Sequence, residues 1–158
     1  MTSANVTIEA LLTGDISRIR ELNRLFAQAF DDADTYLAAP PDDDYLRETL
    51  AKPHVVAIVA IADGIVVGGL VAYQLDKIER RRSEFYIYDL AVAEDWRRRG
   101  IATGLIAKLQ TIASARGAWV IYVQADYGDD PAIALYEKLG AREDVMHFDI
   151  APSATQTP

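Results

Sequence analysis

The sequence predicts an α/β (α+β) fold, and two patterns carry that prediction. The apolar segments Val55–Ala62 and Ile65–Leu75 are typical of neighbouring strands. Asp63-Gly64 between them suits a type I′ hairpin turn, in which both residues have positive φ. Residues 83–125 then alternate strand, helix and strand, which predicts a right-handed crossover between parallel strands. The chain is therefore expected to combine antiparallel and parallel strand pairs with helices.

The predicted crossover has three parts. Ser83–Val92 and Trp119–Ala125 are its strands. Between them, Ile101–Arg116 carries apolar residues at helical spacing, and Gly117 follows where helices commonly end on a residue with positive φ. The stripe expected to face the sheet consists of Ile101, Leu105, Ile106, Leu109, Ile112 and Ala113.

The N-terminal third is expected to supply one more strand and two helices. Val6–Leu12 has the composition of a strand. Asp15 can cap a helix over Ile16–Phe30, whose apolar residues recur at helical spacing. A short helix that begins near Asp42–Asp44, where carboxylates favour the first turn, is expected to end before Pro53.

The C-terminal part is expected to complete the same domain. Asp130 is the predicted N-cap of a last helix that begins at Pro131. Glu143–Ile150 is predicted to be a strand that closes the sheet. Residues 1–150 are thus expected to form one domain, followed by a disordered tail over residues 151–158.

Composition excludes several classes of protein. The 158 residues contain no cysteine, which excludes disulfides, thiolate metal sites and a cysteine nucleophile. His54 and His147 have no partner at metal-ligand spacing, so no metal site is expected. The N-terminus lacks the pattern of a signal peptide, and the longest apolar runs are too short to cross a bilayer. We expect a cytoplasmic protein.

Charge favours a cationic partner. The net charge is −8, which argues against nucleic acid and anionic membrane. Residues 31–48 and 126–149 each hold seven acids, while basic residues gather at Arg80–Arg82 and Arg97–Arg99. One interpretation is a cleft with a basic end for a phosphorylated cofactor and an acidic end for an amine. The other is that these charges only solvate the surface.

The segment after the strand Ser83–Val92 has the features of an anion-binding turn. Arg97–Arg99 precede Gly100, and the predicted helix begins at Ile101. A helix N-terminus offers unpaired backbone N–H groups and the positive end of the helix dipole. Glycine lets the backbone approach a ligand closely or adopt positive φ. The sequence therefore predicts a pyrophosphate site at this turn.

Two motifs resemble those of the GCN5-related N-acetyltransferase superfamily. Arg97, Gly100 and Ala102 match its acyl-CoA signature, and Asp129–Gly140 resembles its later motif, with Asp129 where Asn usually contacts the pantetheine arm. The resemblance implies acetyl-CoA (coenzyme A) as the cofactor. It implies these cofactor-binding residues: Leu90, Ala91, Val92, Arg97, Arg98, Arg99, Gly100, Ile101, Ala102, Thr103, Asp129 and Tyr136.

At full length the chain resembles the aminoglycoside 3-N-acetyltransferases of the gentamicin-resistance type I group. The resemblance rests on Ser83-Glu84 with Tyr86–Val92, on Val120–Pro131 and on Val145–Ile150. It implies a mixed, mostly antiparallel sheet with helices on both faces, and a homodimer. It also implies transfer of acetyl to the 3-amine of the deoxystreptamine ring of gentamicin-type antibiotics, which confers resistance.

Three residues are candidates for catalytic roles. Asp89 interrupts an apolar and aromatic strand, where a carboxylate is costly unless it is paired or faces a ligand. We expect Asp89 to be the base or an amine contact, with a structural partner as the alternative. Glu84, expected on the opposite pleat with Tyr86 and Tyr88, is the other candidate base. The superfamily resemblance implies Tyr136 as donor to the leaving sulfur, against a core role at its helical spacing.

A polycationic sugar requires carboxylates together with aromatic or hydroxyl surface. Asp126-Tyr127-Gly128-Asp129-Asp130 supplies both directly after a strand, where open sheets bind ligands. With Asp130 assigned to the helix cap, Asp126 and Asp129 remain available for a ligand. The predicted acceptor-binding residues are Tyr88, Asp126, Tyr127, Asp129, Glu143 and Asp149.

Two other functions share part of this pattern. An acetyltransferase of the same fold that acts on a polyamine or a protein amine would carry the same cofactor motifs without needing both acidic stretches. A non-catalytic acyl-CoA-sensing module would keep the Arg97–Ala102 turn but not require Asp89 or Tyr136. The presence of all three features favours an enzyme.

Overall fold

The computed structural model describes residues 4–153, which fall into two compact units that divide after residue 124. The first unit contains, in chain order, β1 (Val6–Ala10), α1 (Ile16–Ala29), α2 (Ala33–Leu37), α3 (Asp43–Ala51), β2 (Val55–Ala62), β3 (Ile65–Asp76), β4 (Ser83–Val92), η1 (Glu94–Trp96), α4 (Ile101–Ala115) and β5 (Ala118–Val123). The second contains α5 (Asp130–Leu139). One domain over residues 1–150 stays a prediction, and the expected tail, residues 151–158, lies mostly outside the described residues.

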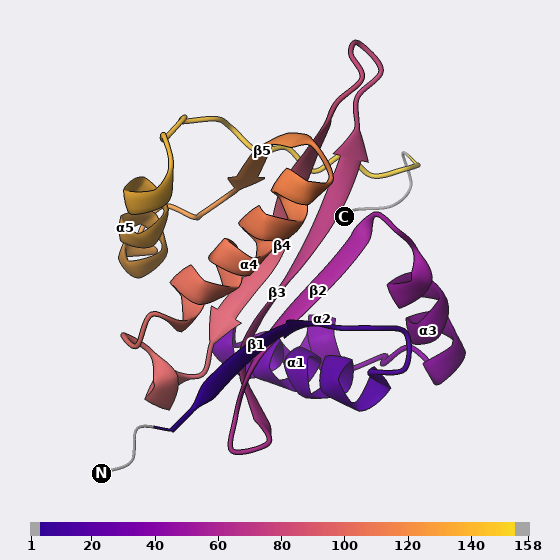
Figure 1. The fold of residues 1–158 in the computed structure, drawn as a ribbon, viewed down its shortest axis with the longest axis vertical. Coiled ribbons are helices and arrows are strands. Elements are labelled where there is room, and N and C mark those ends of the chain that lie inside the picture. The colour runs from indigo at the N-terminus through magenta and orange to yellow at the C-terminus, as the bar shows by residue number, and fades with distance from the viewer. Residues whose placement is uncertain (1–3, 154–158) are drawn as a thin grey trace. The chain divides into compact units, whose positions relative to one another are not determined.

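The strands of the first unit form a five-stranded sheet in the order β1-β2-β3-β4-β5 (Figure 1). Neighbours pair antiparallel except β4 and β5, which are parallel. The β2–β3 turn has φ of 51° at Asp63 and 77° at Gly64, the positive values that a type I′ hairpin requires. The mixed, mostly antiparallel sheet and the parallel pairing across the crossover are confirmed.

Helices cover both faces of this sheet, and two adjacent glycines of β3 identify them. A Cβ at Gly68 would lie 3.1 Å from Ile101 of α4, whereas one at Gly69 would collide with Leu22 of α1. Successive strand residues face opposite sides, so α4 and α1 cover opposite faces (Figure 1). The helices bury Ile19, Leu22, Leu25, Phe26 and Ala27 from α1, and Ile101, Leu105, Ile106, Leu109 and Ala113 from α4. The predicted α4 stripe is confirmed apart from Ile112, which is only partly buried.

β4 contains a β-bulge that the sequence did not reveal. Val71 of β3 pairs with Asp89, and the next β3 residue, Ala72, pairs with Ile87. Tyr88 is therefore the extra residue, without a partner of its own in the β3–β4 ladder. A bulge adds one residue to one strand, so the alternation of faces along β4 changes by one position at Tyr88.

The bulge corrects the prediction that Glu84 and Asp89 lie on opposite pleats. Paired residues of neighbouring strands point to the same face of a sheet. Glu84 pairs with Leu75 and Asp89 pairs with Val71, and both partners share the alternation of Gly69, which faces α1. Both carboxylates thus belong to the face that α1 covers. Strict alternation gave the wrong face because it assumed an unbroken strand.

The helix starts test the predicted caps. Asp42 is confirmed as a cap, because its carboxylate accepts a hydrogen bond from the backbone N–H of Tyr45 at 2.8 Å. α3 ends at Ala51, before Pro53 as predicted. Asp15 occupies the N-cap position of α1, but its carboxylate accepts from the N–H of Leu12 at 2.7 Å and caps no helical N–H.

The short helix α2 was not predicted. Asp32 caps it by accepting from the backbone N–H of Thr35 at 3.0 Å. With five residues and none of them buried, α2 is too short to show helical periodicity in the sequence. The capping residue was the available signal, but it lies within a stretch of several aspartates.

In the second unit, the predicted cap of α5 is off by one residue. Asp129, not Asp130, is the N-cap, and its carboxylate accepts from the N–H of Ala132 at 3.4 Å. Asp130 is the first helical residue, where its charge favours the positive end of the helix dipole. The interpretation that Asp129 has no structural role is therefore wrong.

The strand predicted over Glu143–Ile150 is absent, because residues 141–150 form neither helix nor strand. An alternating apolar pattern becomes a strand only when another strand pairs with its backbone. β5 ends the observed sheet, and the side chains of Met146, Phe148 and Ile150 are exposed. No helix in residues 4–153 has the length and apolar character needed to cross a membrane.

Candidate active site

The predicted anion-binding turn has the required backbone geometry. Gly100 is the N-cap of α4 with φ of 78°, and Arg98 also has positive φ, at 62°. Gly100 has no side chain to cap the helix, so the backbone N–H groups of Ile101, Ala102 and Thr103 are left for another acceptor. A Cβ at Gly100 would meet nothing within 4 Å. No described residue therefore crowds the position of a Gly100 side chain beside the helix N-terminus.

The three arginines of the turn are placed differently. Arg97 donates to the carbonyl oxygen of Val92 at 3.2 Å, and Arg99 donates to that of Asp95 at 3.0 Å. The guanidinium of Arg99 also lies 4.6 Å from the ring centre of Trp96. These contacts hold two positive charges beside the α4 N-terminus. Within residues 4–153, the side chain of Arg98 makes no such contact and is available to an anion.

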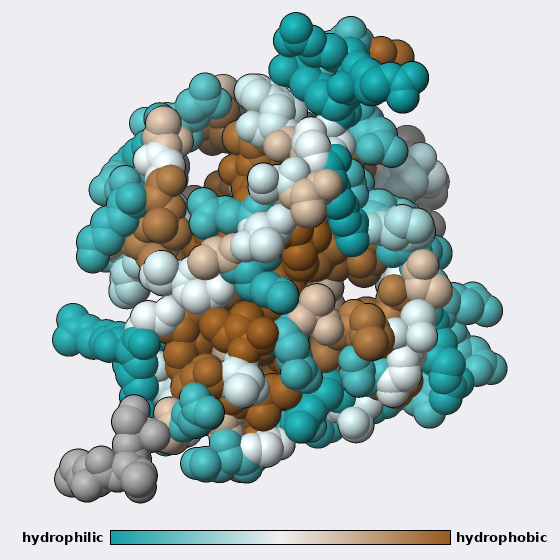
Figure 2. All heavy atoms as spheres, in the orientation of Figure 1, coloured by the Kyte–Doolittle hydropathy of each residue, from teal (hydrophilic) through white to brown (hydrophobic). Residues whose placement is uncertain are grey.

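The two basic groups lie at opposite ends of β4. Arg80–Arg82 precede Ser83, where β4 begins, and Arg97–Arg99 follow Val92, where it ends. A strand of ten residues spans roughly 33 Å. Figure 2 shows hydrophilic side chains over the tip of the β3–β4 hairpin, which carries the first group. Only Arg97–Arg99 adjoin the α4 N-terminus, so a phosphorylated ligand would meet that group alone.

β4 and β5 separate before β4 ends. Their last paired residues are Ile87 and Val123, whereas β4 continues to Val92. On the other side, Leu90, Ala91 and Val92 remain paired with β3. The β5-facing backbone edge of these three residues is consequently unpaired with β5. An extended chain carrying amide groups can hydrogen-bond to such an edge, as an added strand would.

Asp89 follows the bulge and lies along β4 between Ile87, the last residue paired with β5, and Leu90. One carboxylate oxygen accepts a hydrogen bond from the Tyr36 hydroxyl of α2 at 2.5 Å. Burial raises the pKa of Asp89 above its usual value, and the hydrogen bond from Tyr36 acts in the opposite direction. Burial and the adjacent carboxylate raise the pKa of Tyr36, so the phenol keeps its proton. Asp89 therefore has a structural partner, and within residues 4–153 its other oxygen has none.

Four aromatic rings form a tyrosine surface next to Asp89: Tyr73, Tyr86, Tyr88 and Tyr122. Tyr88 packs edge-on against Tyr73 and Tyr86, at 6.1 and 5.7 Å between ring centres, and Tyr86 stacks on Tyr122 at 4.8 Å. The Tyr86 hydroxyl donates to Gln124 at 3.0 Å. Burial raises the pKa of Tyr73, Tyr86 and Tyr122. Tyr73, Tyr86 and Tyr122 thus keep their protons, and the surface offers aromatic rings and hydroxyl groups.

Glu84 shares this face but is matched to a cation. Its carboxylate lies 3.7 Å from the Lys77 ammonium, and its side chain is only 17% exposed. The negative charge of Glu84 is therefore largely balanced within the protein. No cation is among the groups that shift the pKa of Asp89. Of the carboxylates of Glu84 and Asp89, that of Asp89 is therefore the one whose negative charge can bind an amine.

The acidic stretch 31–48 divides into engaged and free carboxylates. Asp32 and Asp42 cap α2 and α3. Arg20 hydrogen-bonds Asp43 at 2.5 Å and holds the pKa of that carboxyl below its usual range, and Arg47 pairs with Asp44 at 2.9 Å. Within residues 4–153, three acids of this stretch have no such partner: Asp31, Asp34 and Glu48. The interpretation that these charges only solvate the surface therefore applies to only part of residues 31–48.

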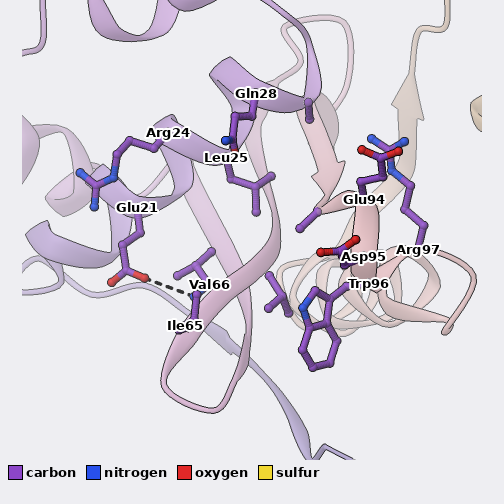
Figure 3. A pocket seen from close by; sticks show the side chains of 13 residues that line it. Glu21, Arg24, Leu25, Gln28, Ile65, Val66, Glu94, Asp95, Trp96 and Arg97 are labelled. Carbon is purple, nitrogen blue, oxygen red and sulfur yellow. Dashed lines mark hydrogen bonds between the residues drawn. The ribbon is translucent and has the colours of Figure 1, made fainter.

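A separate groove of about 810 Å³ lies between α1, the start of β3 and η1 (Figure 3). Arg24 lines it from α1, and Trp96 and Arg97 line it from the other side. The Glu21 side chain accepts the N–H of Val66 at its edge, at 3.2 Å. The groove touches the anion-binding turn through Arg97 and includes none of the tyrosine surface.

The second unit holds the other predicted site residues. The Tyr136 side chain is partly buried, and burial, with a contribution from Asp129, raises its pKa to about 12. Tyr127 is 81% exposed in the turn before α5. Asp149 lies 2.8 Å from His147. For Asp126 and Glu143 we find no side-chain hydrogen bond or ion pair among the described residues, so their roles stay predictions.

Sequence reasoning missed Tyr36, Tyr73, Tyr86 and Tyr122. Tyr86 and Tyr122 stood in predicted parallel strands, and their pairing could have been proposed from the register of the crossover. Tyr36 gave no signal, because its contact with Asp89 spans 53 residues and depends on a helix too short to predict.

Comparison with known proteins gives the family of the chain. The model of the Acetyltransferase (GNAT) family matches residues 19–141, which include β4, the anion-binding turn and α5. The chain belongs to the GNAT acetyltransferase family. Its five-stranded mixed sheet with helices is the GNAT fold, as predicted. This GNAT protein is an N-acetyltransferase that uses acetyl-CoA, and both predictions are confirmed.

Three similar proteins within this family have named activities. An aminoglycoside acetyltransferase from an uncultured soil metagenomic sample is 48% identical, with a TM-score of 0.92 over 94% of this chain and 99% of that one. A second one, solved in complex with sisomicin, is 31% identical, with a TM-score of 0.86 over 94% and 97%. The N-alpha-acetyltransferase of Saccharolobus solfataricus is 33% identical over 142 residues, which are 82% of this chain and 75% of that protein.

The geometry of this GNAT chain fits acetyl-CoA. The α4 N-terminus leaves backbone N–H groups without a capping side chain, and the space in front of Gly100 is open. Two arginines are fixed beside it by bonds to backbone carbonyls. Beyond Ile87 the edge of β4 is unpaired with β5, so its backbone is accessible to an amide-bearing chain. These are the features that a pyrophosphate and a pantetheine arm require.

Proposed function

We propose that this GNAT enzyme is an aminoglycoside 3-N-acetyltransferase, which acetylates the 3-amine of the deoxystreptamine ring of gentamicin-type antibiotics. The observation that carries the substrate class is the 48% identity, over nearly the whole chain, to an aminoglycoside acetyltransferase. The choice of the 3-amine rests on the resemblance of β4, residues 120–131 and residues 145–150 to the gentamicin-resistance type I group. The relative solved with sisomicin supports an aminoglycoside acceptor.

The chemistry next to Asp89 supports the same class of acceptor. Aminoglycosides combine several ammonium groups with flat sugar faces, and they need carboxylates and aromatic surface. The tyrosine surface provides rings and hydroxyls next to a carboxylate whose pKa no cation within residues 4–153 shifts. The free acids of α2 and α3 would attract the remaining ammonium groups. Acceptor contacts from Asp126, Tyr127, Asp129, Glu143 and Asp149 belong to the same proposal.

The reaction requires a base, hydrogen-bond donors for the oxyanion and a proton donor for the leaving sulfur. When bound, acetyl-CoA supplies an acetyl group activated as a thioester. Asp89 accepts a proton from the acceptor ammonium, directly or through water, and its raised pKa makes it a stronger base than an exposed aspartate. Backbone N–H groups in Leu90–Val92 stabilise the oxyanion by hydrogen bonds. Tyr136 holds its proton at neutral pH, since its pKa is about 12, and donates to the departing sulfur.

The test is product analysis. The protein is incubated with acetyl-CoA and gentamicin, the product is weighed by mass spectrometry, and NMR locates the acetylated nitrogen. We expect one acetyl group, on the 3-amine. Acetylation only at a 6′- or 2′-amine would contradict the regiochemistry, and no acetylation of any aminoglycoside would contradict the substrate class.

An N-terminal protein amine is the second candidate acceptor. The 33% identity to an N-alpha-acetyltransferase favours it. A peptide with a free N-terminus competes with gentamicin in the same assay, at equal concentration and with limiting acetyl-CoA. We expect acetyl to pass to gentamicin, and a preference for the peptide would replace the first proposal by the second.

A further inference from the structure

We propose that Tyr36 of α2 is a positioning residue that holds Asp89 ready to accept the proton. The Tyr36 hydroxyl donates to Oδ1 of Asp89 at 2.5 Å, across 53 residues of sequence. Within residues 4–124, Oδ2 has no such partner and is left for the acceptor amine. This inference rests on the proposed function, because it gives Tyr36 a task only if Asp89 is the base.

The position of the Tyr36 hydroxyl is set by packing in the core. Its ring lies 5.7 Å from Phe26 and 5.8 Å from Phe30 between ring centres, at the end of α1. Phe26 is itself 1% exposed, so this contact is anchored in the core. Asp32, the cap of α2, is the charged group on the same helix that acts on Tyr36. The contact with buried Phe26 and the capped helix therefore place the Tyr36 hydroxyl at one oxygen of the Asp89 carboxylate.

The hydrogen bond also favours the charged form of Asp89. The titratable groups of β3 and β4 that interact with Asp89 are the phenols of Tyr73 and Tyr86, which are not cations. Burial favours the protonated carboxyl, and the hydroxyl of Tyr36 favours the carboxylate. Without that hydroxyl, burial would act unopposed and a smaller fraction of the enzyme would hold a proton acceptor.

The sign of the pH effect follows directly. Tyr36→Phe keeps the ring and its packing but removes the hydrogen bond that lowers the pKa of Asp89. The pKa of Asp89 therefore rises further, and the acid limb of the pH profile moves to higher pH. We expect kcat/KM for gentamicin to fall by up to about tenfold at pH values below the acid limb and by no more than about twofold above it, since hydrogen bonds to charged groups are worth about this much.

The experiment compares full pH profiles of wild type, Tyr36→Phe and Phe30→Leu. Phe30→Leu is the matched control, because it removes the contact with the exposed ring of Phe30, leaves the contact with buried Phe26 and keeps the hydroxyl. We expect it to lower Tm without moving the acid limb. Tyr36→Phe should move the acid limb with an unchanged circular dichroism spectrum. An equal loss of kcat/KM at every pH, or the same profile in both variants, would overturn the inference and leave Tyr36 a packing role.

A double variant separates this inference from the proposed function. If Tyr36 acts only through Asp89, then Asp89→Asn combined with Tyr36→Phe is no slower than Asp89→Asn alone. Losses that multiply would overturn the inference, because Tyr36 would then contact the acceptor itself. An Asp89→Asn variant with wild-type kcat would overturn the choice of base, and with it this inference, whatever Tyr36→Phe shows.

Discussion

At the scale of single residues, Asp89 shows why a functional group can be found in a sequence while its environment cannot. A carboxylate within an apolar and aromatic strand is visible in the sequence, because its burial has an obvious cost. The contacts that decide its role are not visible. The bulge at Tyr88 turns Asp89 to the face of Glu84, and Tyr36 reaches it from an unpredicted helix. Both depend on the tertiary structure.

Replacement of Asp89 by Asn is the first test at this scale. Asp89→Asn keeps the shape of the side chain and its hydrogen bond from Tyr36 but removes the charge. We expect kcat for gentamicin to fall about 100-fold or more, as for loss of a general base, with acetyl-CoA binding by calorimetry unchanged. A rise in KM with kcat retained would make Asp89 an amine contact instead. Glu84→Gln is the companion variant, and a larger kcat loss there would reassign the base.

The same substitution should stabilise the fold at neutral pH. Burial raises the pKa of Asp89 in the folded protein above its usual value, so the folded state loses stability as pH rises through that pKa. Asp89→Asn removes this penalty. We expect its Tm to exceed that of wild type at pH 7 to 8, and the difference to shrink as the pH is lowered towards the usual pKa of aspartate, about 3.9. A lower Tm than wild type at pH 8 would contradict the cost assigned to the charge.

At the scale of elements, strands and long helices were predicted well and short or irregular ones were not. β2 and β4 have the predicted bounds, because runs of apolar residues bounded by turn signals are local. α2, the bulge in β4 and the missing strand over residues 143–150 depend on partners elsewhere in the chain. The cap of α5 was missed by one residue because adjacent aspartates compete for the same position.

The two ends of α4 offer a matched test of the anion-binding turn. Gly100 and Gly117 have nearly equal φ, 78° and 72°, and a Cβ at either glycine would meet nothing within 4 Å. Valine at either position costs about 1–3 kcal/mol of backbone strain. We expect Gly100→Val to weaken acetyl-CoA binding at least about tenfold by calorimetry, since a side chain would block the approach to the helix N-terminus. Gly117→Val should lower Tm by a similar amount and leave affinity intact, and equal effects on affinity would count against the turn.

Contact between α1 and the sheet is tested at Gly69. A Cβ there would collide with the side chain of Leu22 and would lie 2.9 Å from the carbonyl oxygen of Ile58. The backbone of β2 cannot easily move to relieve this second contact. We expect Gly69→Ala to destabilise the fold by about 1–3 kcal/mol, measured by urea unfolding. Gly14→Ala is the control, because its Cβ would meet nothing within 4 Å and its φ is not positive. Equal stability of the two variants would contradict the close packing of α1 on β3.

At the scale of the whole molecule, the charge pattern predicted a cationic ligand but not how the charges are distributed over the fold. Asp32 and Asp34 of the acidic stretch lie close in the chain to Tyr36, which contacts Asp89. Part of this stretch serves caps and ion pairs, which the sequence could not separate from the free acids. The basic residues, expected at one end, divide between the two ends of β4. The homodimer implied by the family resemblance stays a prediction that light scattering can check.

The last prediction concerns the electrostatic field that the unpaired acids of residues 31–48 produce around the molecule. If they steer a polycationic acceptor, salt should weaken its capture, because screening shortens the reach of exposed charges. With saturating acetyl-CoA, we expect KM for gentamicin to rise about fivefold between roughly 0.05 and 0.5 M NaCl while kcat changes little. The double variant Asp34→Asn with Glu48→Gln should raise KM at low salt and flatten the salt dependence. A flat response in wild type would return these carboxylates to a role in solvation alone, and the acceptor would then depend on Asp89 and the tyrosine surface.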